Sequence, residues 1–201
     1  MIYRSVGNRC AVDLKDFDLP ISQEKAFEIL VKKGFRQIEI DILAIAKSCI
    51  GNSLYRRGSR LSEAPNFFDC SSFIKYLYGQ KGIWIPRRSI QQSEFGQSVD
   101  LEKVTAGDII CVSGFIDYFR TDPTLGVGHV GIVTENASVI HAKNKDAGIV
   151  ETPLEKFFSK ENFRGVRRII PGGHQICTFV TPGEREVESS DDIGWIIRQN
   201  L

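Results

Sequence analysis

The sequence has no long apolar run, no excess of one sign of charge and no recognisable leader. Its longest apolar runs are about five residues, such as 42–46, whereas a helix that crosses a membrane needs roughly 20, so no transmembrane segment is expected. Lysine and arginine total 26 and aspartate and glutamate total 25, and this balance argues against nucleic acid as a partner. The first ten residues lack the apolar segment of a secretory signal, which predicts a cytoplasmic protein or one exported by a non-standard route.

The cysteines are few and widely spaced. No two of the five stand two to four residues apart, which argues against a zinc ribbon or a redox pair, and five in 201 residues are too few for a disulfide scaffold. Cys49 falls on an apolar helical face and Cys111 in an apolar run, so both are expected in the core. Cys70 differs from them, because it falls at the predicted start of a helix.

The composition and the order of the predicted elements indicate an α+β fold. Apolar residues make up 42 % of the chain and charged residues 25 %, which is typical of a globular protein with one well-buried core. Apolar spacing predicts helices over 22–34, 39–50 and 70–79, followed by strands over 108–112, 130–134, 138–142, 149–152 and 165–170. Helices that precede a mainly antiparallel sheet are typical of the α+β class. Residues 1–20 are expected to be irregular, and the charged tail beyond residue 171 is expected to be solvated, with 195–197 as a segment that can dock back.

Cys70 is a candidate nucleophile because of its place in the predicted helix. Asp69 is the expected N-cap, so Cys70 would lie in the first turn, where unpaired N–H groups and the helix dipole favour negative charge. A free cysteine has a pKa of about 8.5, and this position is expected to lower it towards a reactive thiolate. The alternative is a purely structural cysteine.

A base for this nucleophile is expected on a β-hairpin. If residues 135–137 form a three-residue loop, with Asn136 in the left-handed conformation, His129 and His141 fall on one face as diagonal neighbours. A loop of two or four residues would place them on opposite faces. His174, the remaining histidine, is expected to be exposed.

These three side chains together predict nucleophilic catalysis. Cys70 would attack, His129 would take its proton and return it to the leaving amine, and His141 would hold the far nitrogen of His129 in one tautomer. The alternatives are two ordinary polar strand residues, or a metal site formed with Cys70. We predict no metal and no cofactor.

The segments around these residues resemble the NlpC family of cell-wall cysteine peptidases, which have a papain-like fold. The matching stretches are FDCSSFIKYLYGQKGIWIPRRSIQQ, AGDIICV and GHVGIVTENASVIHA, with AIAKSCIGNSLYRRGS upstream. The resemblance covers about residues 38–170, which implies an NlpC-type peptidase domain there, an N-terminal helical extension over 1–37 and a C-terminal extension over 171–201. It also implies N-terminal helices packed on a mainly antiparallel sheet, with the nucleophilic cysteine at a helix N-terminus.

The resemblance implies roles for single residues. It places Cys70 as the nucleophile, His129 as the base and His141 as the orienting residue. It also places Tyr55 against the site, and it implies that Asp69 and Ser71 bind the free amine of a peptide. The backbone N–H of Cys70 would contribute to an oxyanion hole.

The sequence departs from the family pattern at three places. Ser72 stands where the family has glycine, which bears on how tightly this turn packs. Residues 56–58 replace a turn of the Trp-Gly-Gly kind. The long connection over 114–128 is either a lid or specificity wall, or a surface ornament.

The implied reaction is hydrolysis of an amide bond in a peptidoglycan stem peptide, between D-glutamate and a diamino acid, through an acyl-enzyme on Cys70. Peptidoglycan fragments would be the partner, and the sequence leaves the oligomeric state open. The alternatives are acyl transfer by the same three residues and a catalytically silent binding module. Residues 54–90 carry seven basic and two acidic side chains, a local charge of +5, which is expected to attract an anionic peptide.

Overall fold

A computed structural model describes residues 1–201, and the chain divides into two compact units. The central unit consists of Ile42–Leu77 and Ile85–Pro171, and the terminal unit consists of Met1–Asp41, Tyr78–Trp84 and Gly172–Leu201. The division into 1–37, 38–170 and 171–201 stays a prediction. None of the helices is long and apolar enough to cross a lipid bilayer.

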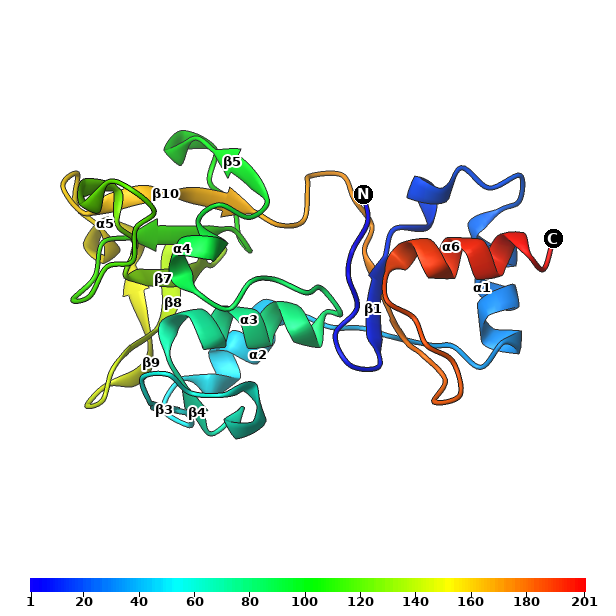
Figure 1. The fold of residues 1–201 in the computed structure, drawn as a ribbon, viewed down its shortest axis with the longest axis horizontal. Helices are drawn as coiled ribbons and strands as arrows, with labels where there is room; N and C mark the ends of the chain where they lie inside the picture. Colours follow the sequence, from blue (N-terminus) through cyan, green and yellow to red (C-terminus); the bar gives the residue numbers. More distant parts are fainter. The chain divides into compact units, whose positions relative to one another are not determined.

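The central unit is built on a six-stranded sheet in which every neighbouring pair is antiparallel (Figure 1). The strand order is β5-β10-β6-β7-β8-β9. The strands are β5 (Gln97–Val99), β6 (Ile109–Val112), β7 (His129–Val133), β8 (Ser138–Asn144), β9 (Gly148–Pro153) and β10 (Phe163–Arg168). This sheet confirms the predicted α+β class.

Helices and short elements complete the central unit. The helices are α2 (Ile42–Cys49), α3 (Cys70–Gln80), α4 (Ser89–Gln92) and α5 (Leu154–Phe157), and the single-turn 3-10 helices are Leu61–Glu63, Leu101–Lys103 and Pro123–Leu125. Residues 52–68 contain the parallel pair β3 (Leu54–Tyr55) and β4 (Phe67–Phe68). The β3 strand contacts β8 and β9, and α5 contacts the same two strands.

The two faces of the central sheet differ in what they bury. Side chains alternate between the two faces along each strand, and one face buries an apolar group on the central strands. Its fully buried members are Ile109, Cys111, Val130, Ile132, Ile140 and Ala142. The opposite face carries the histidines of β7 and β8 beside a second apolar cluster, formed by Ile110, Val112, Val133, Val139, Phe157 and Val166. The histidines therefore lie in a largely dry part of the unit.

The terminal unit contains structure that the sequence analysis missed. Residues 1–20, expected to be irregular, contain β1 (Arg9–Val12) and the 3-10 helix Leu14–Phe17, and the tail contains β11 (Cys177–Val180) and α6 (Ser190–Arg198). The β11 strand pairs with both β1 and β2 (Arg36–Ile38), and α1 (Gln23–Lys32) begins after Ser22, whose side chain accepts from the Lys25 N–H. The acidic stretch over 184–188 is largely exposed and Ile196 and Ile197 dock back, both as predicted, whereas β11 and the length of α6 were not predicted.

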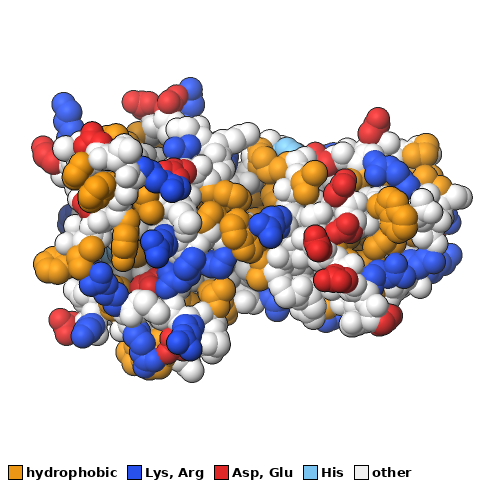
Figure 2. Space-filling model, viewed as in Figure 1, with side chains coloured by type: hydrophobic (Ala, Val, Ile, Leu, Met, Phe, Trp, Pro, Cys, Tyr) orange, Lys and Arg blue, Asp and Glu red, His pale blue; other side chains and the backbone are white.

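The tail packs because its apolar residues share one side of α6. Ile193 and Ile197 are fully buried in a cluster with Phe17, Leu30 and Phe179. The acidic residues that suggested solvation precede α6 or lie in its first turn, and Figure 2 shows acidic side chains on the visible face of this unit. Charge in a connecting loop does not prevent the next helix from burying its apolar side.

The prediction that His174 is exposed was wrong. Its side chain is 25 % exposed, and its Nδ1 lies 3.1 Å from Asp13 Oδ2 and 3.7 Å from Asp16 Oδ2. The ligand atoms of these three residues lie within 4.8 Å of one another, and all three residues belong to the terminal unit. Asp16 also pairs with the N-terminal ammonium group, at 2.8 Å.

The packing of α6 can be tested with two substitutions on the same helix. Ile197→Ala is expected to lower the free energy of unfolding by about 2–4 kcal/mol, because it leaves a cavity at a fully buried position. Trp195→Ala, at a side chain that is 60 % exposed, is expected to change it by less than about 0.5 kcal/mol. Urea denaturation measures both values, and equal effects would contradict the packing described here.

Candidate active site

Cys70 is the first residue of α3, as predicted, and Asp69 caps the helix. The Asp69 carboxylate accepts a hydrogen bond from the Ser72 N–H at 2.7 Å, and the Asp69 carbonyl accepts from the Phe73 N–H at 3.0 Å. Helix formation begins here because this aspartate satisfies an N–H group that has no partner within the helix. The cysteine is thereby held in the first turn, with 9 % of its surface exposed.

The β7–β8 hairpin has the predicted register. The Thr134 N–H donates to the Ser138 carbonyl at 2.9 Å, and Val133 pairs with Val139, so residues 135–137 form a three-residue loop. The left-handed residue is Ala137, with φ 52°, and not Asn136 as predicted. In a three-residue loop the first two residues form a type I turn, and the third takes the left-handed conformation.

The register brings the two hairpin histidines into contact. His129 Nε2 lies 2.8 Å from His141 Nδ1, and His141 Nε2 lies 3.0 Å from Thr152 Oγ1 on β9. If His129 Nδ1 is to accept a proton, its Nε2 must carry the hydrogen and donate to His141. His141 must then carry its own hydrogen on Nε2 and donate to Thr152. The hydroxyl of Thr152, which sequence reasoning missed, can accept this hydrogen, so the contacts are compatible with a free Nδ1 on His129.

One cavity gathers all the residues that the sequence analysis singled out for the site. Its volume is about 680 Å³, and its lining includes Cys70, His129, His141, Tyr55, Asp69 and Ser71. The Cys70 thiol donates weakly to the carbonyl of Gly128, at 3.7 Å, so the sulfur lies beside the residue that precedes His129. The free nitrogen of His129 is its Nδ1, since Nε2 bonds to His141.

Phe157 packs against both histidines and was not identified from the sequence. Its ring centroid lies 4.8 Å from that of His141 and 5.6 Å from that of His129. Burial lowers the pKa of His129 to about 4 and, together with the nearby His129 and Lys143, that of His141 to about 3. Both rings are therefore neutral at pH 7. The only local signal for Phe157 was its place in a short helix after Pro153.

The expected lowering of the Cys70 pKa is not found. Burial raises the pKa of the thiol to about 11, and the nearby Asp69 acts in the same direction. The N–H groups of Val130 and Ser71 and the charge of Arg87 act against this rise without reversing it. The N–H groups at the helix start lower the pKa of Cys70, as predicted, but burial disfavours the charged thiolate and raises the pKa by more. The site therefore rests as a neutral thiol beside a neutral imidazole, and the thiol needs a base at the moment of attack.

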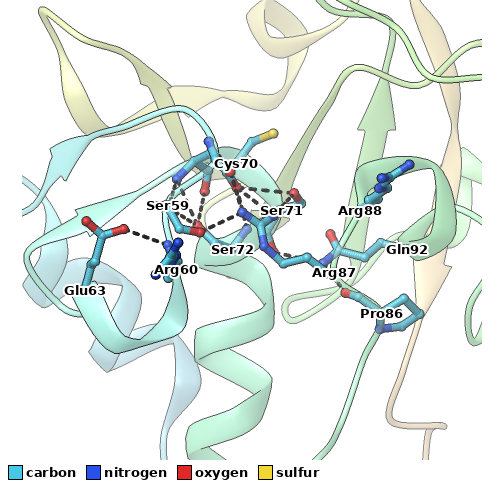
Figure 3. A network of polar contacts seen from close by, with 12 residues as sticks. Ser59, Arg60, Glu63, Cys70, Ser71, Ser72, Pro86, Arg87, Arg88 and Gln92 are labelled. Atoms are coloured by element: carbon cyan, nitrogen blue, oxygen red, sulfur yellow. Dashed lines mark hydrogen bonds and ion pairs between the residues drawn. The ribbon is translucent and has the colours of Figure 1, made fainter.

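Arg87 holds the carboxylate that precedes the cysteine (Figure 3). Its Nη1 and Nη2 donate to the two carboxylate oxygens of Asp69 at 3.1 and 2.6 Å, and its guanidinium also bonds to Ser71 Oγ at 2.8 Å. Asp69 and Ser71, predicted to bind a free amine, are thus both engaged by Arg87. Sequence reasoning counted Arg87 only as one member of a basic segment, because its partner lies 18 residues away.

Ser72 fits the position where a glycine was expected. It is fully buried, and its Oγ lies 2.7 Å from Ser59 Oγ and accepts from the Asp69 N–H at 2.9 Å. Ser59 Oγ accepts from the same N–H at 2.8 Å. The extra hydroxyl therefore has polar partners in a buried place, and this is what a buried hydroxyl requires.

Gln92 on α4 braces the first turn of α3. Its Nε2 donates to the carbonyl oxygens of Ser71 and Pro86, both at 2.9 Å. The chain segment that leads to Arg87 is thus tied to the residue after the nucleophile. Figure 3 shows the Cys70 sulfur pointing away from this network, so the network positions the backbone without engaging the thiol.

The connection over 114–128 forms part of the cavity wall. At the start of this connection, the Asp117 carboxylate accepts hydrogen bonds from the Ser113 hydroxyl at 2.5 Å and from the Gly114 N–H at 2.7 Å. The strand-like bridge of Tyr118 to Val127 joins its two sides. Phe115, Ile116 and Tyr118 line the cavity, and the Phe115 side chain is fully exposed. Of the two predicted alternatives, the geometry favours a wall of the site over an ornament.

The resting protonation state can be measured without a substrate. The ultraviolet absorbance of a thiolate, taken as the difference between the wild type and Cys70→Ser, is expected to be absent at pH 7. It is expected to appear only in strongly alkaline solution, because the pKa of Cys70 is raised to about 11. A thiolate signal at pH 7 would show that sulfur and imidazole rest as an ion pair, contrary to this account.

Known proteins share this architecture. The model of the NlpC/P60 family matches residues 53–168, which is more than half of the chain. The chain is 34 % identical over 105 residues to a protein of Bacillus cereus named gamma-D-glutamyl-L-lysine dipeptidyl-peptidase, covering 52 % of this chain and 29 % of that one. It is 28 % identical over 131 residues to the gamma-DL-glutamyl hydrolase of Bacillus subtilis, covering 65 % of this chain and 29 % of that one. The chain thus spans less than two fifths of the length of the first curated relatives it matches.

Solved structures agree in fold. An NLP/P60 family protein from Staphylococcus aureus superposes with a TM-score of 0.52 at 25 % identity, over 77 % of this chain and 44 % of that one. The peptidoglycan hydrolase RipB of Mycobacterium tuberculosis superposes with a TM-score of 0.50 at 22 % identity, over 75 % and 69 % of the two chains, and this shows the fold alone. The predicted papain-like α+β fold is confirmed, and the chain belongs to the NlpC/P60 family.

Proposed function

We propose that this chain is a cysteine peptidase that hydrolyses an amide bond of a peptidoglycan stem peptide, between D-glutamate and a diamino acid. The observation that carries the proposal is the hydrogen bond between His129 Nε2 and His141 Nδ1, in the cavity that Cys70 also lines. This bond leaves the other nitrogen of His129 free to act as a base. A second ring that orients the first is the arrangement that nucleophilic catalysis needs.

The acylation step follows from the neutral resting state. His129 Nδ1 removes the proton of the Cys70 thiol while the sulfur attacks the carbonyl carbon of the scissile amide. The oxygen that becomes negative is stabilised by the backbone N–H of Cys70, which has no acceptor within α3 because it lies at the helix start. His129 then gives its proton to the leaving amine, the C–N bond breaks, and a thioester on Cys70 remains.

Hydrolysis completes the cycle. A water molecule gives a proton to His129 and its oxygen attacks the thioester carbon, which releases the acid and returns the proton to the sulfur. His141 and Thr152 keep His129 in the same tautomer in both steps, since their hydrogen bonds involve only the far nitrogen.

The choice of substrate rests on the names of relatives. One is named for the γ-D-glutamyl-L-lysine bond, and a protein of Bacillus licheniformis, 27 % identical over 134 residues, is named a peptidoglycan DL-endopeptidase. These names support an amide next to D-glutamate as the bond that is cleaved, and they support hydrolysis over transfer to another acceptor.

The proposal predicts that two residues are required for turnover. With a peptide that contains a γ-D-glutamyl–diaminopimelate bond, Cys70→Ser and His129→Ala are each expected to lower kcat/KM at least about 10³-fold. Cys177→Ser is the matched control, because this thiol lies in the terminal unit, outside the cavity, and it is expected to retain the wild-type rate. Mass spectrometry of the products identifies the bond, and full activity of Cys70→Ser would refute the proposal.

Thr152 provides a finer test of the same mechanism. Thr152→Val removes the hydroxyl that accepts from His141, and is expected to lower kcat about 10-fold while KM changes little. Thr152→Ser keeps the hydroxyl and is expected to stay within about threefold of the wild type. Steady-state kinetics on the same peptide compares them, and equal rates for the two variants would show that the hydroxyl does not position the histidines.

A further inference from the structure

Three side chains that can bind a metal ion meet in the terminal unit, away from the active-site cavity. They are Asp13, Asp16 and His174, and none of them lines that cavity. The set offers one imidazole nitrogen and two carboxylate oxygens. Imidazole and carboxylate together are donors that zinc and similar divalent ions accept.

A single turn of 3-10 helix brings the two aspartates together. Asp13 is the N-cap of Leu14–Phe17, and its carboxylate accepts a hydrogen bond from the Lys15 N–H at 3.1 Å. Its carbonyl accepts from the Asp16 N–H, also at 3.1 Å. Because a 3-10 helix has about three residues per turn, side chains three residues apart lie on the same side. The spacing of the aspartates therefore directs both carboxylates to one place.

The pairing of β1 with β11 brings the histidine to the same place. Val12, the last residue of β1, pairs with Cys177, the first residue of β11, in an antiparallel ladder. Asp13 therefore leaves the sheet where His174 approaches it, and the Gln175 N–H donates to Asp13 Oδ2 at 3.0 Å. Figure 1 shows the blue N-terminal segment beside the orange tail in this unit. The sequence predicted no metal, and these side chains meet only in the folded unit.

The distances between the ligand atoms fit a shared ion better than a hydrogen-bonded ion pair. His174 Nδ1 lies 3.1 Å from Asp13 Oδ2 and 3.7 Å from Asp16 Oδ2. Two ligand atoms that are each about 2.0–2.1 Å from a tetrahedral zinc ion lie about 3.4 Å apart. The Nδ1 atom is buried and makes no hydrogen bond, although Asp13 Oδ2 is within reach. The ring nitrogen therefore does not point at this oxygen, and its lone pair is available to an ion.

A hydroxyl group without a partner lies beside the cluster. Tyr3 is 4 % exposed, and its hydroxyl has no hydrogen-bond partner. Its backbone is fixed by Ser190, whose hydroxyl accepts from the Tyr3 N–H at 3.0 Å and whose N–H donates to the Tyr3 carbonyl at 2.8 Å. Burial raises the pKa of Tyr3 to about 12, and the nearby charges of Asp16 and Asp13 act in the same direction. A bound ion with its water would give this buried hydroxyl the partner that such groups require.

We propose that Asp13, Asp16 and His174 bind a zinc ion in the terminal unit. His174 Nδ1 and one oxygen of each aspartate are the ligands, and a water molecule that bonds to the Tyr3 hydroxyl fills the fourth position. The ion displaces the N-terminal ammonium group from Asp16 Oδ2, a contact of 2.8 Å in which both groups are partly exposed. Since the ligands come from the N-terminal segment and from the tail, the ion links the two and stabilises the folded unit.

Calorimetry with Zn²⁺ alone tests the site in the full chain. The starting protein is Cys70→Ala, which removes the thiol of the active-site cavity as a competing ligand, and it is expected to bind one zinc ion. Adding His174→Ala or Asp16→Asn is expected to raise Kd at least about 100-fold, and adding Tyr3→Phe about 10-fold. Mg²⁺ is expected to bind far more weakly than Zn²⁺, because it prefers an octahedron of oxygen ligands.

The matched control is Asp18→Asn on the same turn. Asp18 is exposed, and its left-handed backbone, with φ 46°, suits asparagine as well as aspartate. The substitution makes the same change of charge as Asp16→Asn and is expected to keep Kd within about threefold. A loss of affinity as large as that in Asp16→Asn would show that zinc responds to local charge and not to the named ligands.

Stability and crystallography give two further readouts. Zn²⁺ at about 100 times Kd is expected to raise the Tm by about 5 °C or more, and to leave the Tm of His174→Ala unchanged. Anomalous scattering at the zinc absorption edge is expected to place the ion between His174 and the two aspartates. No binding of zinc, equal binding in His174→Ala, or an ion found only at His129 and His141 would overturn the assignment. None of these outcomes depends on whether the chain cleaves a peptide.

Discussion

The register of one hairpin is the constraint on which the site depends. A three-residue loop between β7 and β8 places His129 and His141 on the same face and allows their rings to bond at 2.8 Å. A shift by one residue would send every side chain of one strand to the other face. Such a shift is costly, because the fully buried side chains of Val130, Ile132 and Ile140 would leave the core. The core thus protects the geometry of the histidines.

Burial and charge act on the site in opposite ways. Burial keeps both rings neutral and raises the pKa of the Cys70 thiol, so the reacting groups rest uncharged. The rim of the same cavity is positively charged and open to solvent. A dry centre suits proton transfer between the thiol and the imidazole, and a charged rim suits binding of an anionic peptide at a distance from that centre.

Side-chain hydrogen bonds hold the residues on either side of the nucleophile. Ser72 occupies a glycine position, and Ser59 supplies the partner for its hydroxyl. Arg87 then ties the cap residue Asp69 to Ser71, and Gln92 ties Ser71 to the same segment. A buried polar group is tolerated only with such partners, so these four side chains act as one unit that sets where the sulfur lies.

Local patterns in the sequence determined the helix start at Cys70, the cap at Asp69 and the shared face of His129 and His141, since each depends only on neighbouring residues or on the length of one loop. Only the tertiary structure decided that burial raises the pKa of Cys70, that Arg87 neutralises Asp69, that Phe157 and Thr152 hold the histidines, and that the tail packs through β11 and α6. Those outcomes depend on which segments, distant in the sequence, are in contact in the fold. Burial and ion pairing arise from such tertiary contacts and leave no periodic signal along the chain.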